Sequence, residues 1–130
     1  MASFPKFKNL PIIIGESDTE GCAACEGENL TYRNGTVYSS YQAAAFAKTY
    51  ELADFYNVNL IGAVTWAFEF EDMPWFAGFR DLATNGVDKP VLNIYRMFGM
   101  MSGTRLNVSG GNYDLKTMTD KGVRESFADI

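Results

Sequence analysis

The fold expected for this chain is decided by the stretch PIIIGESDTEG, residues 11–21. Its apolar half predicts a short buried strand, about Ile12 to Gly15, and the polar half that opens at Glu16 predicts a loop. The pattern recurs downstream, where an apolar run from Leu60 to Phe68 gives way to the acidic stretch 69–72. Carboxylates at the ends of buried strands are typical of α/β barrels, whose catalytic groups lie at the C-terminal ends of the strands.

Between the two predicted strands, a long loop to about Thr36 and then one helix that ends near Tyr56 are expected. Ser39 or Ser40 is its candidate N-cap, because a hydroxyl oxygen accepts hydrogen bonds from the first free backbone amides. The apolar face of this helix consists of residues spaced by four and seven positions: Tyr41, Ala45, Leu52 and Tyr56.

A second helix is predicted from Pro90, which suits the first turn of a helix, to Gly103. It is apolar nearly all round, so we expect it to be covered on more than one side. Residues 104–108 alternate like a strand, and the polar tail that follows is the candidate start of a β-rich region.

The order strand, helix, strand, helix, strand predicts an α/β fold with a parallel strand pair. Two strands cannot close a barrel, and a whole (β/α)₈ barrel takes roughly 250 residues. A complete small domain is the alternative, but an open sheet of so few strands leaves its apolar edges exposed. The pattern therefore favours a piece of a larger structure.

Composition excludes several classes of function. Sixteen acidic and eleven basic residues give a net charge of −5, which argues against a nucleic-acid partner. No apolar stretch reaches the roughly 18 residues that predict a membrane-spanning helix, and residues 1–8 contain no signal-like apolar run. The chain has no histidine, so serine or cysteine catalysis that depends on histidine is not expected. Acid–base chemistry is left to carboxylates, Tyr or Lys.

Cys22 and Cys25 form a single Cys-x-x-Cys motif. Without a second pair or a histidine the motif cannot complete a tetrahedral zinc site, so we expect neither a metal nor a cofactor. A redox motif of the thioredoxin type lies at a helix N-terminus, whereas this pair leads into the loop-like stretch 26–29. A structural or incidental cysteine pair is therefore favoured over redox chemistry.

Five motifs give the chain a resemblance to a known family. They are PIIIGESDTEGCAAC (11–25), YRNGTVYSSY (32–41), AVTWAFEFED (63–72), ATNGVDKPVLN (83–93) and RMFG (96–99). Together they resemble the region after strand seven in bacterial β-xylosidases of glycoside hydrolase family 39. The resemblance covers about residues 11 to 105, which is most of the chain.

The resemblance implies a partial (β/α)₈ TIM barrel. Residues 1–102 would be its C-terminal portion, with the last two β/α units, and residues 103–130 the start of a β-rich accessory domain. The family hydrolyses β-1,4-xylosidic bonds of xylo-oligosaccharides with retention of configuration. Retention needs two carboxyl groups about 5–5.5 Å apart. The nucleophile maps onto Glu16, whereas the Asn-Glu motif of the acid/base has no counterpart in this sequence.

An enzyme of this family would therefore need N-terminal barrel strands that this chain does not supply, and the isolated chain is expected to be inactive. Any signal peptide would lie in that preceding part, so the residues here predict no localisation. The alternatives are a non-catalytic carbohydrate-binding piece of a barrel protein and a small redox domain that uses the cysteine pair.

Four further residues are candidates for contacts with the xylo-oligosaccharide or another β-xyloside. In the family, acids after strand eight hydrogen-bond to sugar hydroxyls, which implies such a role for Glu69 or Glu71. Trp66 is expected to form the floor of the sugar site, with barrel core as the alternative. Trp75 either lines the cleft or packs its own loop.

Overall fold

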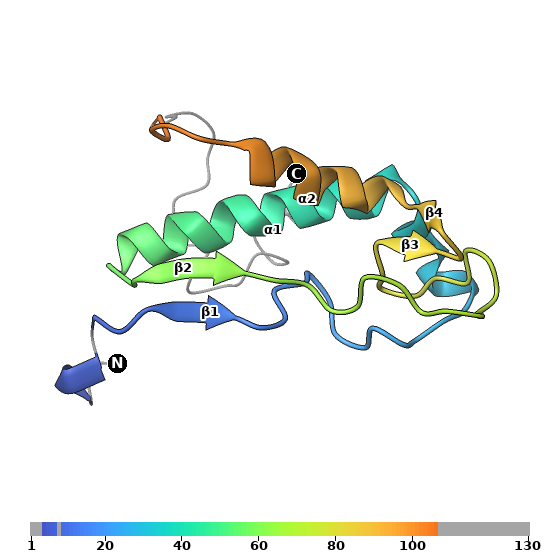
Figure 1. Ribbon diagram of the computed structural model, residues 1–130, viewed down its shortest axis with the longest axis horizontal. Helices are drawn as coiled ribbons and strands as arrows, with labels where there is room; N and C mark the ends of the chain where they lie inside the picture. The colour runs from blue at the N-terminus through green and yellow to red at the C-terminus, as the bar shows by residue number, and fades with distance from the viewer. Residues whose placement is uncertain (1–3, 8, 107–130) are drawn as a thin grey trace, which may run out of the picture.

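The computed structural model describes residues 4–7 and 9–106, with two short parallel strands, two helices and a small hairpin (Figure 1). The 3-10 helix η1 covers Pro5–Phe7 and strand β1 covers Ile12–Ile14. Strand β2, Leu60–Ala63, follows helix α1, Thr36–Phe55. Most of the region expected to be β-rich, residues 103–130, lies outside the described residues, and no strand includes residues 104–106.

Strands β1 and β2 pair in parallel, as the strand-helix-strand order predicted. Ile12 pairs with Leu60 and Ile14 with Ala63, with an irregularity after Ile12. Both strands are shorter than predicted, because the chain leaves the sheet at Gly15 and at Val64 and turns toward the polar loops. The C-terminal ends of the two strands therefore lie beside each other.

Helix α1 begins at Thr36, and the predicted serine caps are wrong. Gly35 occupies the N-cap position, and no side chain caps the helix. Ser39 and Ser40 lie inside the helix, where their hydroxyls donate to the carbonyls of Gly35 and Thr36, four residues earlier. The preceding loop is also more ordered than predicted, because the 3-10 helix η2, Glu28–Asn34, leads directly into α1.

A turn at Asn85-Gly86 closes a hairpin between β3, Ala83–Thr84, and β4, Val87–Asp88. Both turn residues have positive φ, 44° and 79°, as tight two-residue hairpin turns require. Helix α2, Pro90–Met100, then starts at Pro90 as predicted but ends three residues before Gly103.

The core lies where the N-terminal half of α1 meets the start of α2. It consists of Tyr38, Leu82, Val91 and Leu92, with Tyr32 and Tyr95 packed against it. Beneath it, the buried Lys89 Nζ forms an ion pair with the buried Asp81 and donates to the carbonyl of Phe79 at 3.0 Å.

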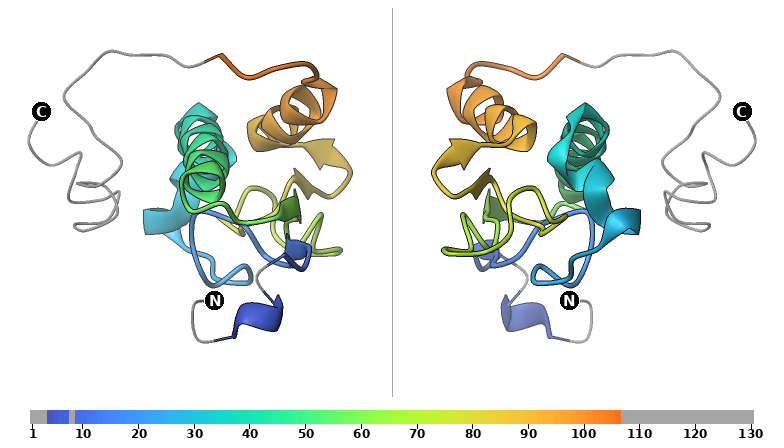
Figure 2. Two further views of the ribbon diagram at one scale, coloured as in Figure 1. Left: turned by 90° about the vertical axis from the view of Figure 1, so that its left-hand side faces the viewer. Right: turned by 90° about the vertical axis from the view of Figure 1, so that its right-hand side faces the viewer.

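Both helices lie on the same side of the β1–β2 sheet (Figures 1 and 2). On the strands, Ile13 and Ile61 are 61% and 60% exposed. Parallel sheets are normally covered on both faces. The described sheet is open, so the fold shown is a small open α/β arrangement, and the partial barrel stays a prediction. Helix α2 is also less covered than predicted, since Met97 and Met100 are exposed.

Candidate functional site

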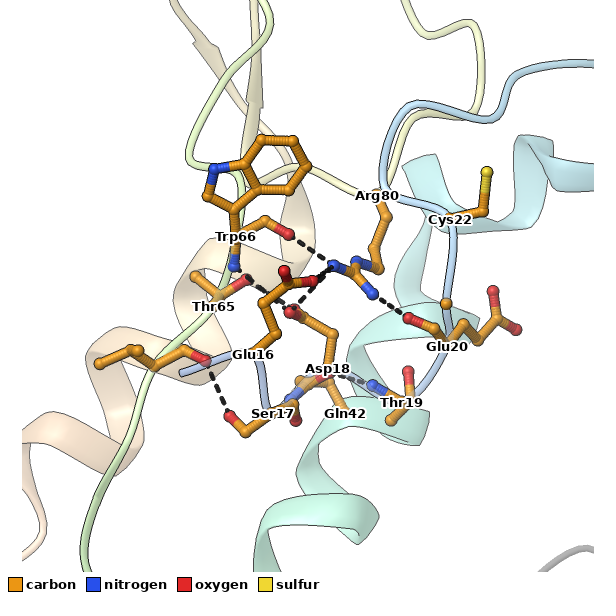
Figure 3. Close-up of polar contacts among 12 residues, drawn as sticks. Glu16, Ser17, Asp18, Thr19, Glu20, Cys22, Gln42, Thr65, Trp66 and Arg80 are labelled. Atoms are coloured by element: carbon orange, nitrogen blue, oxygen red, sulfur yellow. Dashed lines mark hydrogen bonds and ion pairs between the residues drawn. The ribbon is translucent and has the colours of Figure 1, made fainter. Parts of the chain in front are cut away.

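Glu16 follows directly on strand β1 and presents its carboxylate to solvent. Its side chain is 57% exposed, and its Oε2 atom forms an ion pair with Arg80 Nη2 at 2.7 Å (Figure 3). A carboxylate held by one charge-assisted hydrogen bond keeps a defined orientation while its other oxygen is free for a reacting group. Glu16 is therefore both accessible and oriented.

Arg80 is the link between the two strand ends. It is 4% exposed, and its Nη2 donates to Glu16 and to the carbonyl of Trp66 at 2.8 Å. Its Nη1 donates to the carbonyl of Glu20. A buried guanidinium with acceptors on two segments, the loop after β1 and the chain after β2, fixes those segments relative to one another. Glu16 after β1 and Trp66 after β2 thus share one cationic partner.

Asp18 forms the buried floor of this polar cluster. Its side chain is 3% exposed and lies 3.5 Å from Arg80 Nη2. Thr65 Oγ1 donates to Oδ1 at 2.5 Å, Tyr95 Oη to the same oxygen at 3.0 Å, and the Trp66 amide to Oδ2 at 3.3 Å. The Asp18 carboxylate thus has four partners within the protein and almost no exposed surface.

Helix α1 supports the loop that carries these acids. Gln42 is fully buried, accepts a hydrogen bond from the Thr19 amide at 3.3 Å and donates to the carbonyl of Ser17 at 3.4 Å. The Ser17 amide and hydroxyl both donate to the carbonyl of Val64, at 2.8 and 3.1 Å. The loop after β1 is therefore bound to both α1 and the end of β2.

Two tyrosines beside the cluster remain protonated over a wide pH range. Burial raises the pKa of Tyr38 to about 12, and the neighbouring Asp18 adds to that shift. Burial also raises the pKa of Tyr95, and its hydrogen bond to Asp18 acts in the same direction. The Tyr95 hydroxyl therefore stays a donor to Asp18 and ties helix α2 to the site.

A second polar cluster adjoins the first through Glu20. Its carboxylate accepts hydrogen bonds from Tyr32 Oη and from Arg33 Nε, the latter at 2.9 Å. Arg33 is 4% exposed, and its remaining donors meet the carbonyls of Gly21, Cys22 and Gly78 at 3.3–3.4 Å. Gly78 has φ 98°, and a Cβ there would lie 3.0 Å from Leu30, so this close approach requires glycine.

Cys22 and Cys25 are joined by a disulfide within the loop after β1. The pair does not precede an α-helix, since the nearby element is the 3-10 helix η2. Within residues 4–7 and 9–106, no cluster of three metal-ligating side chains is present. In the same residues no helix is both long and apolar enough to cross a bilayer.

The remaining predicted site residues differ in whether the structure links them to Glu16. Trp66 is 51% exposed and shares Arg80 with Glu16, so these two are brought together. Glu69 Oε1 accepts from the Gly86 amide at 2.5 Å, which gives it a role in the β3–β4 hairpin. Glu71 is exposed in a turn, and Trp75, 59% exposed, packs at an angle against Phe76 with ring centroids 6.4 Å apart.

Sequence reasoning missed Arg80, Asp18 and Tyr95. Arg80 and Asp81 stand as a charged pair within the otherwise apolar segment 76–83, which is the signal that these charges are buried and paired. The pairing of Arg80 with Glu16 could not be predicted from the sequence, because the two residues lie 64 positions apart.

No protein-family model, curated protein or solved structure matches the chain. The resemblance to glycoside hydrolase family 39 accordingly depends on the motifs quoted above.

Proposed function

We propose that this chain is the C-terminal part of a retaining glycoside hydrolase that acts on β-xylosides, with Glu16 as the nucleophile. One observation carries the proposal. An exposed carboxylate stands at the C-terminal end of a parallel strand, oriented by a buried arginine that also holds the end of the neighbouring strand. Catalytic groups of α/β barrels occupy this position.

The reaction assigned to Glu16 is a double displacement. Its free carboxylate oxygen attacks the anomeric carbon of the xyloside, and the bond from that carbon to the leaving-group oxygen breaks. The leaving-group oxygen takes a proton from a general acid. Water, deprotonated by the same group, then releases xylose from Glu16 with overall retention of configuration.

The proposal places the acid/base on other strands of the barrel, since the described acid beside Glu16 does not suit the role. Asp18 is close to Glu16, since both contact Arg80 Nη2, but its buried oxygens are occupied by donors. The exposed faces of Ile13 and Ile61 support the same conclusion, because strands carrying the missing acid would cover them. The active form is thus a barrel to which other strands contribute.

The sugar site is proposed to extend from Glu16 over Trp66. The exposed indole supplies an apolar surface for the xylose ring, and Trp75, which is also exposed, is a further candidate for stacking on the sugar. Of the two acids, Glu71 is the better candidate for a sugar hydroxyl, because Glu69 already accepts the Gly86 amide.

The test joins residues 1–130 to strands one to six of a family 39 barrel and follows the hydrolysis of an aryl β-xyloside. The isolated chain should show no turnover, and the joined protein should be active.

Glu16→Ala should abolish turnover, and azide should restore it with an α-xylosyl azide as product, because a small anion fills the vacated space. Glu26→Ala, at an exposed loop acid, is the matched control and should leave turnover unchanged. Turnover by the isolated chain, or an active Glu16→Ala variant, would refute the proposal.

A second candidate function is carbohydrate binding without catalysis. The exposed aromatic side chains of Trp66 and Trp75 favour it, since stacking on a sugar ring needs no nucleophile. Titration of xylo-oligosaccharides into the isolated chain separates the two: binding that Trp66→Ala abolishes, together with an inactive joined protein, supports the binding function alone.

A further inference from the structure

The disulfide loop lies against the residue that orients Glu16. Cys22 and Cys25 close a loop in which Ala23 is 5% exposed. The carbonyl of Ala23 accepts the backbone amide of Arg80 at 2.9 Å. The same stretch supplies the carbonyl of Glu20 to the Arg80 side chain. Both the backbone and the guanidinium of Arg80 are therefore held by this short segment.

The loop is held in place by more than one contact, and its own conformation needs support. Arg33 donates to the carbonyls of Gly21 and Cys22 at 3.4 and 3.3 Å. Cys22 has φ 51°, in the left-handed region that residues with a side chain adopt rarely. A covalent link between residues 22 and 25 limits the alternative conformations to which such a loop would relax.

The disulfide is accessible to reagents although Ala23, which follows Cys22, is buried. Cys22 is exposed and Cys25 is partly exposed, whereas Ala23 between them is buried. A thiolate attacks a disulfide sulfur directly, so exposure of Cys22 permits exchange without unfolding of the chain.

We propose that the Cys22–Cys25 disulfide is a redox-sensitive positioning element for Glu16, which acts through Arg80. The contacts above support the coupling between the disulfide loop and Arg80. Only the effect of this coupling on catalysis rests on the proposed function. A dithiol reductant opens the link: one thiolate attacks a cysteine sulfur, the S–S bond breaks, and the other cysteine leaves as a thiol. The second thiol of the reductant then attacks the reductant's own sulfur in the mixed disulfide and releases the bound cysteine. The cysteines gain two electrons and two protons, and the dithiol becomes a cyclic disulfide. The loop then relaxes and Arg80 loses its fixed approach to Glu16.

The experiment compares the oxidised and dithiothreitol-reduced chain under native conditions. Hydrogen exchange at the Arg80 amide should become faster on reduction, because its acceptor belongs to the released loop. Carbodiimide coupling of an amine to Glu16, measured by mass spectrometry, should rise about threefold, the size expected for loss of a partly exposed ion pair. Coupling to the exposed Glu71, and exchange in the middle of α1, should not change.

Two variants separate the coupling from general effects of the reductant. The double variant C22S/C25S should show fast Arg80 exchange and fast Glu16 coupling with or without dithiothreitol. Arg80→Gln should show fast Glu16 coupling in both redox states while the loop still responds to reduction. Equal rates in the two states of the unaltered chain would overturn the proposal, and so would a reduction that also accelerates exchange throughout α1. Neither measurement involves a sugar, so failure here leaves the xyloside proposal standing, and the reverse also holds.

Discussion

The region at the start of helix α2 and the β1–β2 sheet differ in how completely they are covered. Around the start of α2, Lys89 and Val91 are each 1% exposed and Asp81 is 3% exposed, and this buried core is the closed region of the molecule. In the sheet, Ile13 and Ile61 expose most of their surface. The comparison teaches that the described part of the chain completes its own packing at the strand ends and around the hairpin, whereas one face of its sheet stays largely in solvent.

The largest effect is expected at the buried ion pair of the closed region. Lys89→Met leaves Asp81 buried without its cation, which should cost about 3–5 kcal/mol in the free energy of unfolding. The matched control Arg96→Met breaks the exposed pair with Asp88 and should cost less than about 1 kcal/mol. Urea unfolding followed by circular dichroism measures both, and similar losses would contradict the difference between buried and exposed pairs.

The second effect concerns Tyr38, in the same closed region. Burial raises its pKa from 10.0 to about 12, so the folded chain keeps the proton that the unfolded chain releases. This contribution to stability is present below about pH 10 and is lost as the pH rises through 12, by about 2–3 kcal/mol. Tyr38→Phe should remove that part of the decline. Parallel stability curves for the two proteins between pH 9 and about 12 would show that the hydroxyl is not buried.

The smallest effect is expected on the uncovered sheet face. Ile13→Thr and Ile61→Thr should each change the free energy of unfolding by less than about 0.5 kcal/mol, because both side chains are already in solvent. They should also reduce the self-association expected of an open apolar sheet, measured by sedimentation velocity. Ile14→Thr, at a partly buried position in the same strand, should cost more. A large loss for Ile13→Thr would mean that the face is already covered in the isolated chain.

Some helices and strands were predicted correctly from the sequence and others were not. The strand-helix-strand order followed from apolar runs that the chain interrupts with polar loops, and Pro90 marked the start of α2 correctly. The start of α1 was predicted wrongly, because Gly35 ends one helix and begins the next and leaves no side-chain signal. The hairpin turn was visible in Asn85-Gly86, but two-residue strands are too short to show alternation.

The candidate site was predictable in part. Glu16 and Trp66 stood out because each follows an apolar run. Arg80, which joins them, did not, because a contact across 64 positions depends on how the loops fold back. The charge of Asp18 was visible, but its burial by Thr65 and Tyr95 depends on tertiary packing.

The central claim is that Glu16 is the residue that attacks the sugar. The most direct measurement is covalent trapping of the joined protein with a 2-fluoro-xyloside that carries a good leaving group, followed by peptide mass spectrometry. The 2-fluoro substituent slows release of the glycosyl-enzyme, so the attacking carboxylate keeps the label. The account predicts one label, on the peptide that contains Glu16, and no label in the Glu16→Ala variant. A label on Glu69 or Glu71 would contradict it and move the nucleophile to the end of the second strand.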